Sequence, residues 1–187
     1  MRYHDEELLE ARRERERKKH TTLETGIFVG DELIRFTYTT FSDLAIRLPL
    51  PKHFMILPDV IKNVKYPSTY APRIVMSSLD VLINFTFDRF EVKDGDIKAM
   101  AKQFQTALKN ADPSLIIKGQ ANAETDQGNE MSWFGYGDHQ IDGQSYNRAC
   151  LIKMKDFILY TTFNCPSKEK GNWENIIEKI FMAIEEM

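Results

Sequence analysis

The sequence predicts an α+β fold in which helices cover both faces of an antiparallel β-sheet. From residue 26 onward, apolar and polar residues alternate in several short segments, which is typical of half-buried strands. One segment with helical spacing separates two groups of strands, and another follows the last strand. The connections are short and no repeating strand–helix–strand pattern occurs, so neighbouring strands are expected to pair antiparallel.

A charged helix is predicted at the N-terminus. The first 20 residues hold seven Lys/Arg and six Asp/Glu, with the acidic residues first and the basic residues last. This order complements the dipole of a helix, and Glu14 and Lys18 lie at helical pairing distance. We predict a solvated charged helix or tail over residues 1–22 and one α+β domain over residues 23–187. The alternative, an arm for an acidic partner, is disfavoured by the interleaved Glu14 and Glu16.

The first half of the domain is expected to contain short strands and one helix. GIFVGDELIRFTYTT is predicted to turn at Gly30-Asp31. LAIRLPL is predicted as a strand that ends at Pro49 and Pro51, and LPDVIKN as one helical turn. RIVMSS and VLINFTFD are predicted to form a hairpin. DGDIKAMAKQFQTALKNADP has helical spacing, with an Asp start and a stop at Pro113.

Three or four longer strands follow, in LIIKGQANAETD, EMSWFGYGDHQI, QSYNRACLIKMK and FILYTTFNC. The chain closes with a helix that carries Trp173, Ile176, Ile177, Ile180 and Ile184. Ser167 or Asn172 is the expected N-cap of that helix. A turn at Asp142-Gly143 places His139 opposite Tyr146 and Trp133 opposite Ile152. A turn at Lys155-Asp156 places Tyr146 opposite Cys165 and Arg148 opposite Phe163.

This register distributes apolar residues over both faces of the sheet. One face carries Trp133, Ile152, Met154, Phe157, Leu159 and Phe163. The other carries Phe134, Tyr136, Leu151, Ile158 and Tyr160. Cover by a helix or loop is therefore expected on each side. Gly135 and Gly137 lie on the first face, where the missing side chains are predicted to let a helix approach closely.

The composition excludes several classes of function. The net charge of −3 and the pI of about 5.9 argue against a nucleic-acid or membrane partner. No apolar run approaches the ~18 residues of a membrane span. The N-terminus lacks the apolar core of a signal peptide, so a cytoplasmic protein with reduced cysteines is expected. Cys150 and Cys165 are predicted to lie roughly 13 Å apart, beyond the ~7 Å limit of a disulfide.

The motifs of common catalytic and cofactor sites are absent from the sequence. It contains no GxxxxGK[ST] loop, HExxH, CxxC or GxSxG, and the four histidines lack metal-ligand spacing. The predicted register places Cys165 and His139 two strand spacings apart, about 10 Å, which disfavours a thiol nucleophile. No catalytic residue, metal or cofactor is therefore predicted.

Two groups of residues are candidate binding sites. The stretch KYPSTYAPR combines Lys65, Tyr66, Tyr70 and Arg73, and tyrosines beside cations are common at recognition surfaces. Tyrosines near prolines also pin loops to a core, and we favour this structural role. The second group comprises residues at one sheet end that could line a small-molecule pocket: His139, Tyr146, Arg148 and Cys165.

Several segments resemble a family of uncharacterised bacterial proteins with the PsbP-like α/β/α sandwich fold. These are FSDLAIRLP, LPDVIKNVKYPSTYAPRIV, VLINFTF, SWFGY, IDGQSYN and TTFNCP with the following Trp173. The resemblance covers roughly residues 25–187 and is most specific in KYPS…P and FNCP…W. It implies the fold; better-known members, which include the photosystem II subunit PsbP and a Ran-binding import factor, are binding or assembly factors. It provides no ligand residues to transfer.

The leading functional hypothesis is a non-enzymatic cytoplasmic module for protein interaction or assembly, with KYPSTYAPR as the candidate contact. One alternative is a small-molecule binder or enzyme at the sheet end. Another is an accessory protein of a secretion or toxin system. The sequence leaves the partner and the oligomeric state open.

Overall fold

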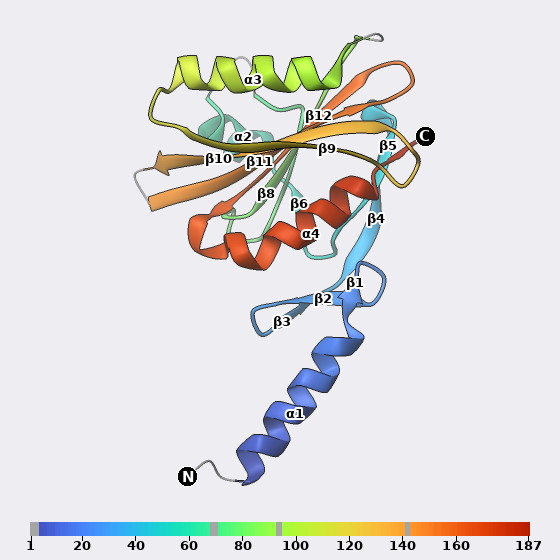
Figure 1. Cartoon of the computed structure of the whole chain (residues 1–187), viewed down its shortest axis with the longest axis vertical. Coiled ribbons are helices and arrows are strands. Elements are labelled where there is room, and N and C mark those ends of the chain that lie inside the picture. Colours follow the sequence, from blue (N-terminus) through green and yellow to red (C-terminus); the bar gives the residue numbers. More distant parts are fainter. Residues whose placement is uncertain (1–3, 68–70, 93–94, 141–142) are drawn as a thin grey trace.

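The computed structural model describes residues 4–67, 71–92, 95–140 and 143–187. The chain forms three layers, with α3 (Ile97–Ala111) on one face of a central sheet and α4 (Lys170–Met182) on the other (Figure 1). The charged helix α1 (His4–Lys19) projects away from this body. The predicted α+β sandwich with a charged N-terminal helix is confirmed.

The central sheet is antiparallel throughout. Among the described residues it has seven strands, in the spatial order β6, β7, β8, β12, β11, β10, β9. Their bounds are β6 (Met55–Ile56), β7 (Ile74–Ser77), β8 (Asn84–Phe90), β9 (Ile116–Glu124), β10 (Glu130–Gln140), β11 (Gly143–Lys153) and β12 (Ile158–Pro166). A short helix, α2 (Asp59–Lys65), follows the edge strand β6.

Two small sheets flank the body within the described residues. The first contains β1 (Thr21–Thr22), β2 (Gly26–Val29) and β3 (Glu32–Ile34), and the second contains β4 (Phe36–Phe41), β5 (Ile46–Pro51) and β13 (Glu185–Glu186). Short 3-10 turns lie at η1 (Ser42–Leu44) and η2 (Ser167–Glu169). The predicted hairpin at Gly30-Asp31 is confirmed, because Val29 pairs with Glu32. Thr22 pairs with Gly26, so β1 and β2 bridge the predicted boundary between residues 22 and 23.

Each face of the central sheet has its own apolar core. On the α4 side, Phe85, Phe163 and Trp173 pack with residues of β5, and the predicted face residues from Ile152 to Phe163 belong to this cluster. On the α3 side, Phe134 and Leu151 pack with Ile97 and other α3 residues. Both predicted apolar faces are therefore confirmed, and each is covered by a helix (Figure 1).

The register of β10 and β11 differs from the prediction by two residues. Gln140 pairs with Gly143 and His139 with Gln144, so Gly143 is a strand residue and does not belong to the turn. Because side chains alternate with a period of two, this shift leaves every residue on its predicted face. The predicted turn at Lys155-Asp156 is correct, since Tyr146 pairs with Cys165.

Three local predictions are wrong. Pro49 and Pro51 lie inside β5, because β13 pairs only with Ile46 and Arg47 and leaves the prolines on a free edge. Neither Ser167 nor Asn172 caps α4: η2 leads directly into the helix, and no side chain accepts a hydrogen bond there. The space beside Gly135 is occupied by the ring of Tyr146, not by a helix.

The start of α3 depends on a side-chain cap. Asp96 Oδ1 accepts hydrogen bonds from the backbone N–H groups of Lys98 (2.9 Å) and Ala99 (3.1 Å). Asp96→Ala is expected to lower the free energy of unfolding by about 1 kcal/mol, because these donors lose their partner. Urea denaturation measures this loss. Asn172→Ala, at the uncapped start of α4, is the matched control, with an expected change below about 0.5 kcal/mol. Equal losses in the two variants would contradict the assignment.

Candidate functional site

The side chain of Lys65 and the backbone of Arg73 hold the predicted binding loop to the domain. Lys65 Nζ donates a hydrogen bond to the carbonyl of Val81 (2.6 Å), and burial lowers the pKa of Lys65. The backbone N–H of Arg73 donates to Asp88 Oδ1 (3.2 Å). Lys65 therefore ties the start of the loop to the turn after β7, and Arg73 ties its end to β8. Arg73 is itself an exposed residue.

The tyrosines of this loop differ in what the structure describes. Tyr66 is half-buried, and burial raises its pKa to about 12. This environment agrees with a tyrosine that pins the loop to the core. Tyr70 lies outside the described residues.

The three described members of the predicted sheet-end group, Tyr146, Arg148 and Cys165, are all buried. Arg148 is buried: its Nη2 donates to Glu178 Oε1 (2.7 Å), and its guanidinium lies over the ring of Trp133. Cys165 is buried, and burial raises its pKa to about 12, so it remains a thiol at neutral pH. The side chain of His139 lies outside the described part of the structure. Tyr146 is the described member of the group that lines a cavity.

The sheet-end cavity has a volume of about 230 Å³ and lies between the ends of β9, β10 and β11 and the start of α4. Its polar lining includes Lys118, Lys170, Ser145, Ser167, Gln144, Tyr136 and Tyr146. Sequence reasoning identified Tyr146 but missed both lysines, because Lys118 and Lys170 are separated by three strands along the chain.

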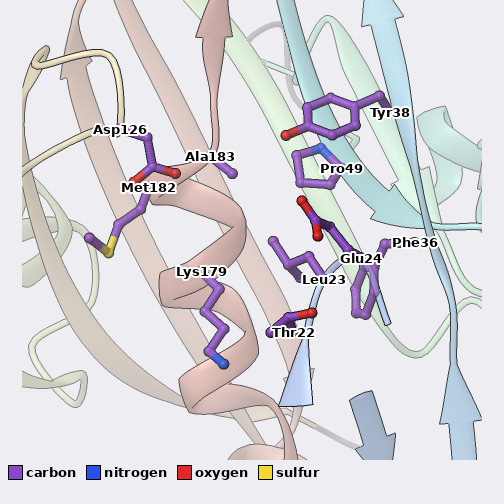
Figure 2. A pocket seen from close by; sticks show the side chains of 10 residues that line it. All are labelled: Thr22, Leu23, Glu24, Phe36, Tyr38, Pro49, Asp126, Lys179, Met182 and Ala183. Carbon is purple, nitrogen blue, oxygen red and sulfur yellow. The ribbon is translucent and has the colours of Figure 1, made fainter. Parts of the chain in front are cut away.

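A second cavity of about 570 Å³ lies where the N-terminal segment meets α4 and the β4–β5 sheet (Figure 2). Leu23, Phe36 and Pro49 form apolar walls, and the carboxylate of Glu24 and the hydroxyl of Tyr38 reach toward the opening. Burial, and secondly the charge of Glu185, raise the pKa of Tyr38. Lys179 turns away and donates to the carbonyl of Thr21 (2.6 Å).

An exposed apolar surface lies at the β6 edge of the central sheet. Among the described residues it comprises seven large apolar side chains from β6, α2 and the turn between β7 and β8: Met55, Ile56, Val60, Ile61, Val64, Leu79 and Leu82. We call it the α2 surface. Met55 pairs with Ser77, directly before that turn, and Lys65 at the end of α2 contacts Val81 within it. The three segments are therefore neighbours. No residue of α2 is buried in the described structure.

Among the described residues, no group of three or more His, Cys, Asp or Glu side chains is placed to hold a metal ion. The described helices include none that is long and apolar enough to cross a membrane.

Comparison of the backbone with solved structures identifies the architecture. Cyanobacterial PsbP (CyanoP) from Synechocystis sp. PCC 6803 matches with a TM-score of 0.61, 11% identity, and coverage of 87% of this chain and 98% of CyanoP. This chain has the PsbP-like fold. LpqN, described as involved in cell envelope biogenesis of Mycobacterium tuberculosis, shares the fold with a TM-score of 0.54, 15% identity, and coverage of 88% and 96%.

At the level of sequence, no known family model and no curated protein matches this chain. The identities of 11% and 15% establish a common fold with the solved structures and nothing about activity. Function is therefore inferred from the surfaces of this chain.

Proposed function

We propose that this PsbP-like protein is a non-enzymatic cytoplasmic module that docks a partner protein on the α2 surface. The observation that carries the proposal is the exposure of that surface: Val60 and Val64 are each 79% exposed, and both lie on one face of α2. Leu79, in the turn between β7 and β8 to which Lys65 of α2 is bound, is 71% exposed. Single exposed apolar residues are ordinary, whereas a group rimmed by polar residues is typical of a docking site.

Charge indicates what kind of partner fits. Residues 52–82 contain four basic and two acidic residues, a net charge of +2, whereas the whole chain carries −3. A partner with an apolar face rimmed by carboxylates would complement this segment. Electrostatic complementarity of this kind mainly accelerates encounter and selects the partner, while the apolar contacts provide the affinity.

The environment of the two thiols supports the non-enzymatic part of the proposal. Cys150 and Cys165 are both buried and free, and burial raises the pKa of each. A reactive cysteine requires a lowered pKa and access to substrate. Neither thiol therefore has the environment of a nucleophile.

A double charge substitution tests the docking surface. Val60→Asp with Val64→Asp is expected to weaken binding of a purified partner at least tenfold, about 1.4 kcal/mol, because two apolar contacts become buried carboxylates. The matched control is Thr37→Asp with Thr106→Asp, at exposed positions outside the surface. Affinity enrichment compared across wild type and both variants selects the partner, and calorimetry measures the binding constant. A partner set that the double valine variant retains in full would remove the α2 surface from the proposal.

A further inference from the structure

The turn between β7 and β8 holds a valine in a strained backbone conformation. Val81 has a φ of 62°, in the left-handed region that a β-branched side chain rarely adopts. The other described non-glycine residue with a positive φ is Ala45, directly after η1. Strain of this kind persists only where the surrounding contacts fix the conformation, and it is common in segments that bind ligands or switch.

The carbonyl of Val81 accepts hydrogen bonds from two different parts of the fold. Lys65 Nζ, at the end of α2, donates to it at 2.6 Å, and Asn84 Nδ2, at the start of β8, donates at 3.3 Å. Asn84 is fully buried, and its Oδ1 accepts a hydrogen bond from Ser77 Oγ (2.8 Å), which orients the amide. Asn84 therefore holds the turn to the sheet, and Lys65 holds it to α2.

Other polar groups of the turn are bonded within it. Asp80 Oδ1 accepts hydrogen bonds from Ser78 Oγ (2.6 Å) and from the backbone N–H of Leu82 (3.1 Å). The backbone N–H of Val81 donates to the carbonyl of Ser78 (3.0 Å). Within this closed set of bonds, the turn presents two apolar side chains to solvent, since Leu79 is 71% and Leu82 52% exposed.

The position of α2 depends on lysines more than on apolar packing. None of its residues is buried in the described structure. Lys62 Nζ donates to the carbonyl of Arg73 (3.5 Å), directly before β7, and Lys65 donates to the turn. Burial lowers the pKa of Lys65, and the nearby charge of Asp80 opposes this shift. A hydrogen bond from a charged donor is roughly twice as strong as one between neutral groups, so the bond from Lys65 can hold a strained turn.

From these contacts we infer that Lys65 is the positioning residue of the α2 surface: it holds the strained turn so that Leu79 and Leu82 join the apolar side chains of α2 in one docking surface. The inference rests on the proposed function, because it assigns α2 and the turn to the same partner protein. Without this bond, Val81 is expected to relax to a negative φ and the two leucines to leave the surface. Ordering them in advance lowers the entropy lost when a partner binds.

Hydrogen exchange of the free ¹⁵N-labelled chain tests the positioning role without a partner. In Lys65→Met, the amides of Val81 and Leu82 are expected to exchange at least about tenfold faster, because local opening of the turn costs less free energy. The strong NOE between the N–H and Hα of Val81, which a positive φ produces, should weaken as well. Lys62→Met makes the same chemical change on α2 and should leave both signals unchanged. Wild-type exchange in Lys65→Met, or equal acceleration in Lys62→Met, would overturn the inference.

The partner selected by the affinity enrichment described above tests the consequence for docking. Lys65→Met is expected to weaken its binding about tenfold. Val81→Gly in the same chain should restore binding to within about threefold of wild type, because glycine adopts a positive φ without strain. A lysine that contacted the partner directly would not be rescued in this way, so a loss that Val81→Gly leaves in place would overturn the positioning role.

The valine variant distinguishes failure of this inference from failure of the proposed function. Wild-type affinity in Lys65→Met, with binding lost in Val60→Asp with Val64→Asp, would overturn the role of Lys65 and leave docking on α2 intact. Wild-type affinity in both variants would overturn docking on the α2 surface itself. The exchange experiment separates the two cases independently, because it reports on the turn in the free chain.

Discussion

Phe163→Ala is expected to lower the free energy of unfolding by about 3–5 kcal/mol. Phe163 is fully buried, and its ring centre lies 4.9 Å from that of Phe85 and 5.5 Å from that of Trp173. The ring therefore joins β12 to β8 and α4 at the centre of the larger core. Truncation leaves a cavity that Phe85, Trp173 and the rigid sheet cannot close, so the cost exceeds the transfer free energy alone.

Guanidinium denaturation monitored by tryptophan fluorescence measures this loss. Phe28→Ala makes the same chemical change on the half-exposed β2, where Phe28 contacts Arg17 and His20 of the N-terminal segment. A loss of about 1 kcal/mol is expected there, because less apolar area leaves water on folding. Similar losses in both variants would contradict the central place of Phe163 in the core on the α4 side of the sheet.

Glu178→Ala is expected to lower the free energy of unfolding by about 2–3 kcal/mol. This substitution leaves the guanidinium of Arg148 in the core without its 2.7 Å carboxylate partner. Loss of one member of a fully buried pair costs about 3–5 kcal/mol. The expected value is smaller because the side chain of Glu178 is 39% exposed and water can partly replace it.

The double variant tests whether Arg148 and Glu178 stabilise the fold as a pair. Arg148→Met removes the charge and keeps an apolar chain over Trp133, so Arg148→Met with Glu178→Ala should be more stable than Glu178→Ala alone. A double-mutant cycle from thermal denaturation provides the coupling energy. Independent, additive losses would mean that the pair does not hold β11 to α4.

Sequence patterns predicted most of the fold because the long strands are half-buried. Period-two alternation through Leu159 and Phe163 fixed which residues face α4, and a two-residue error in one register left the faces unchanged. The error arose because Gly143 was assigned to the turn, whereas it pairs with Gln140. The prolines of β5 were wrongly predicted to end the strand, because the sequence does not show that β13 pairs only with Ile46 and Arg47 and leaves the prolines on a free edge.

The candidate sites were harder to predict because local sequence patterns do not show which side chains the folded protein leaves exposed. Val60 and Val64 have the same spacing as buried helix residues, and only the fold shows that this face is uncovered. Lys118 of β9 and Lys170 of α4 line one cavity only in the folded chain. The sequence analysis instead selected KYPSTYAPR as the candidate contact with a partner. The structure gives Lys65 a bracing role beside the surface that the sequence analysis missed.

Photo-crosslinking in cells tests the proposed docking surface most directly. Benzoylphenylalanine at position 64 of α2, where the native valine is 79% exposed, should produce a discrete adduct with one partner protein, and Val60→Asp in the same chain should abolish it. The same probe at Thr106 on α3 should produce no such adduct. Fractionation of these cells shows whether the adduct lies in the cytoplasm, as proposed. An adduct formed from position 106 but not from position 64 would contradict docking on the α2 surface.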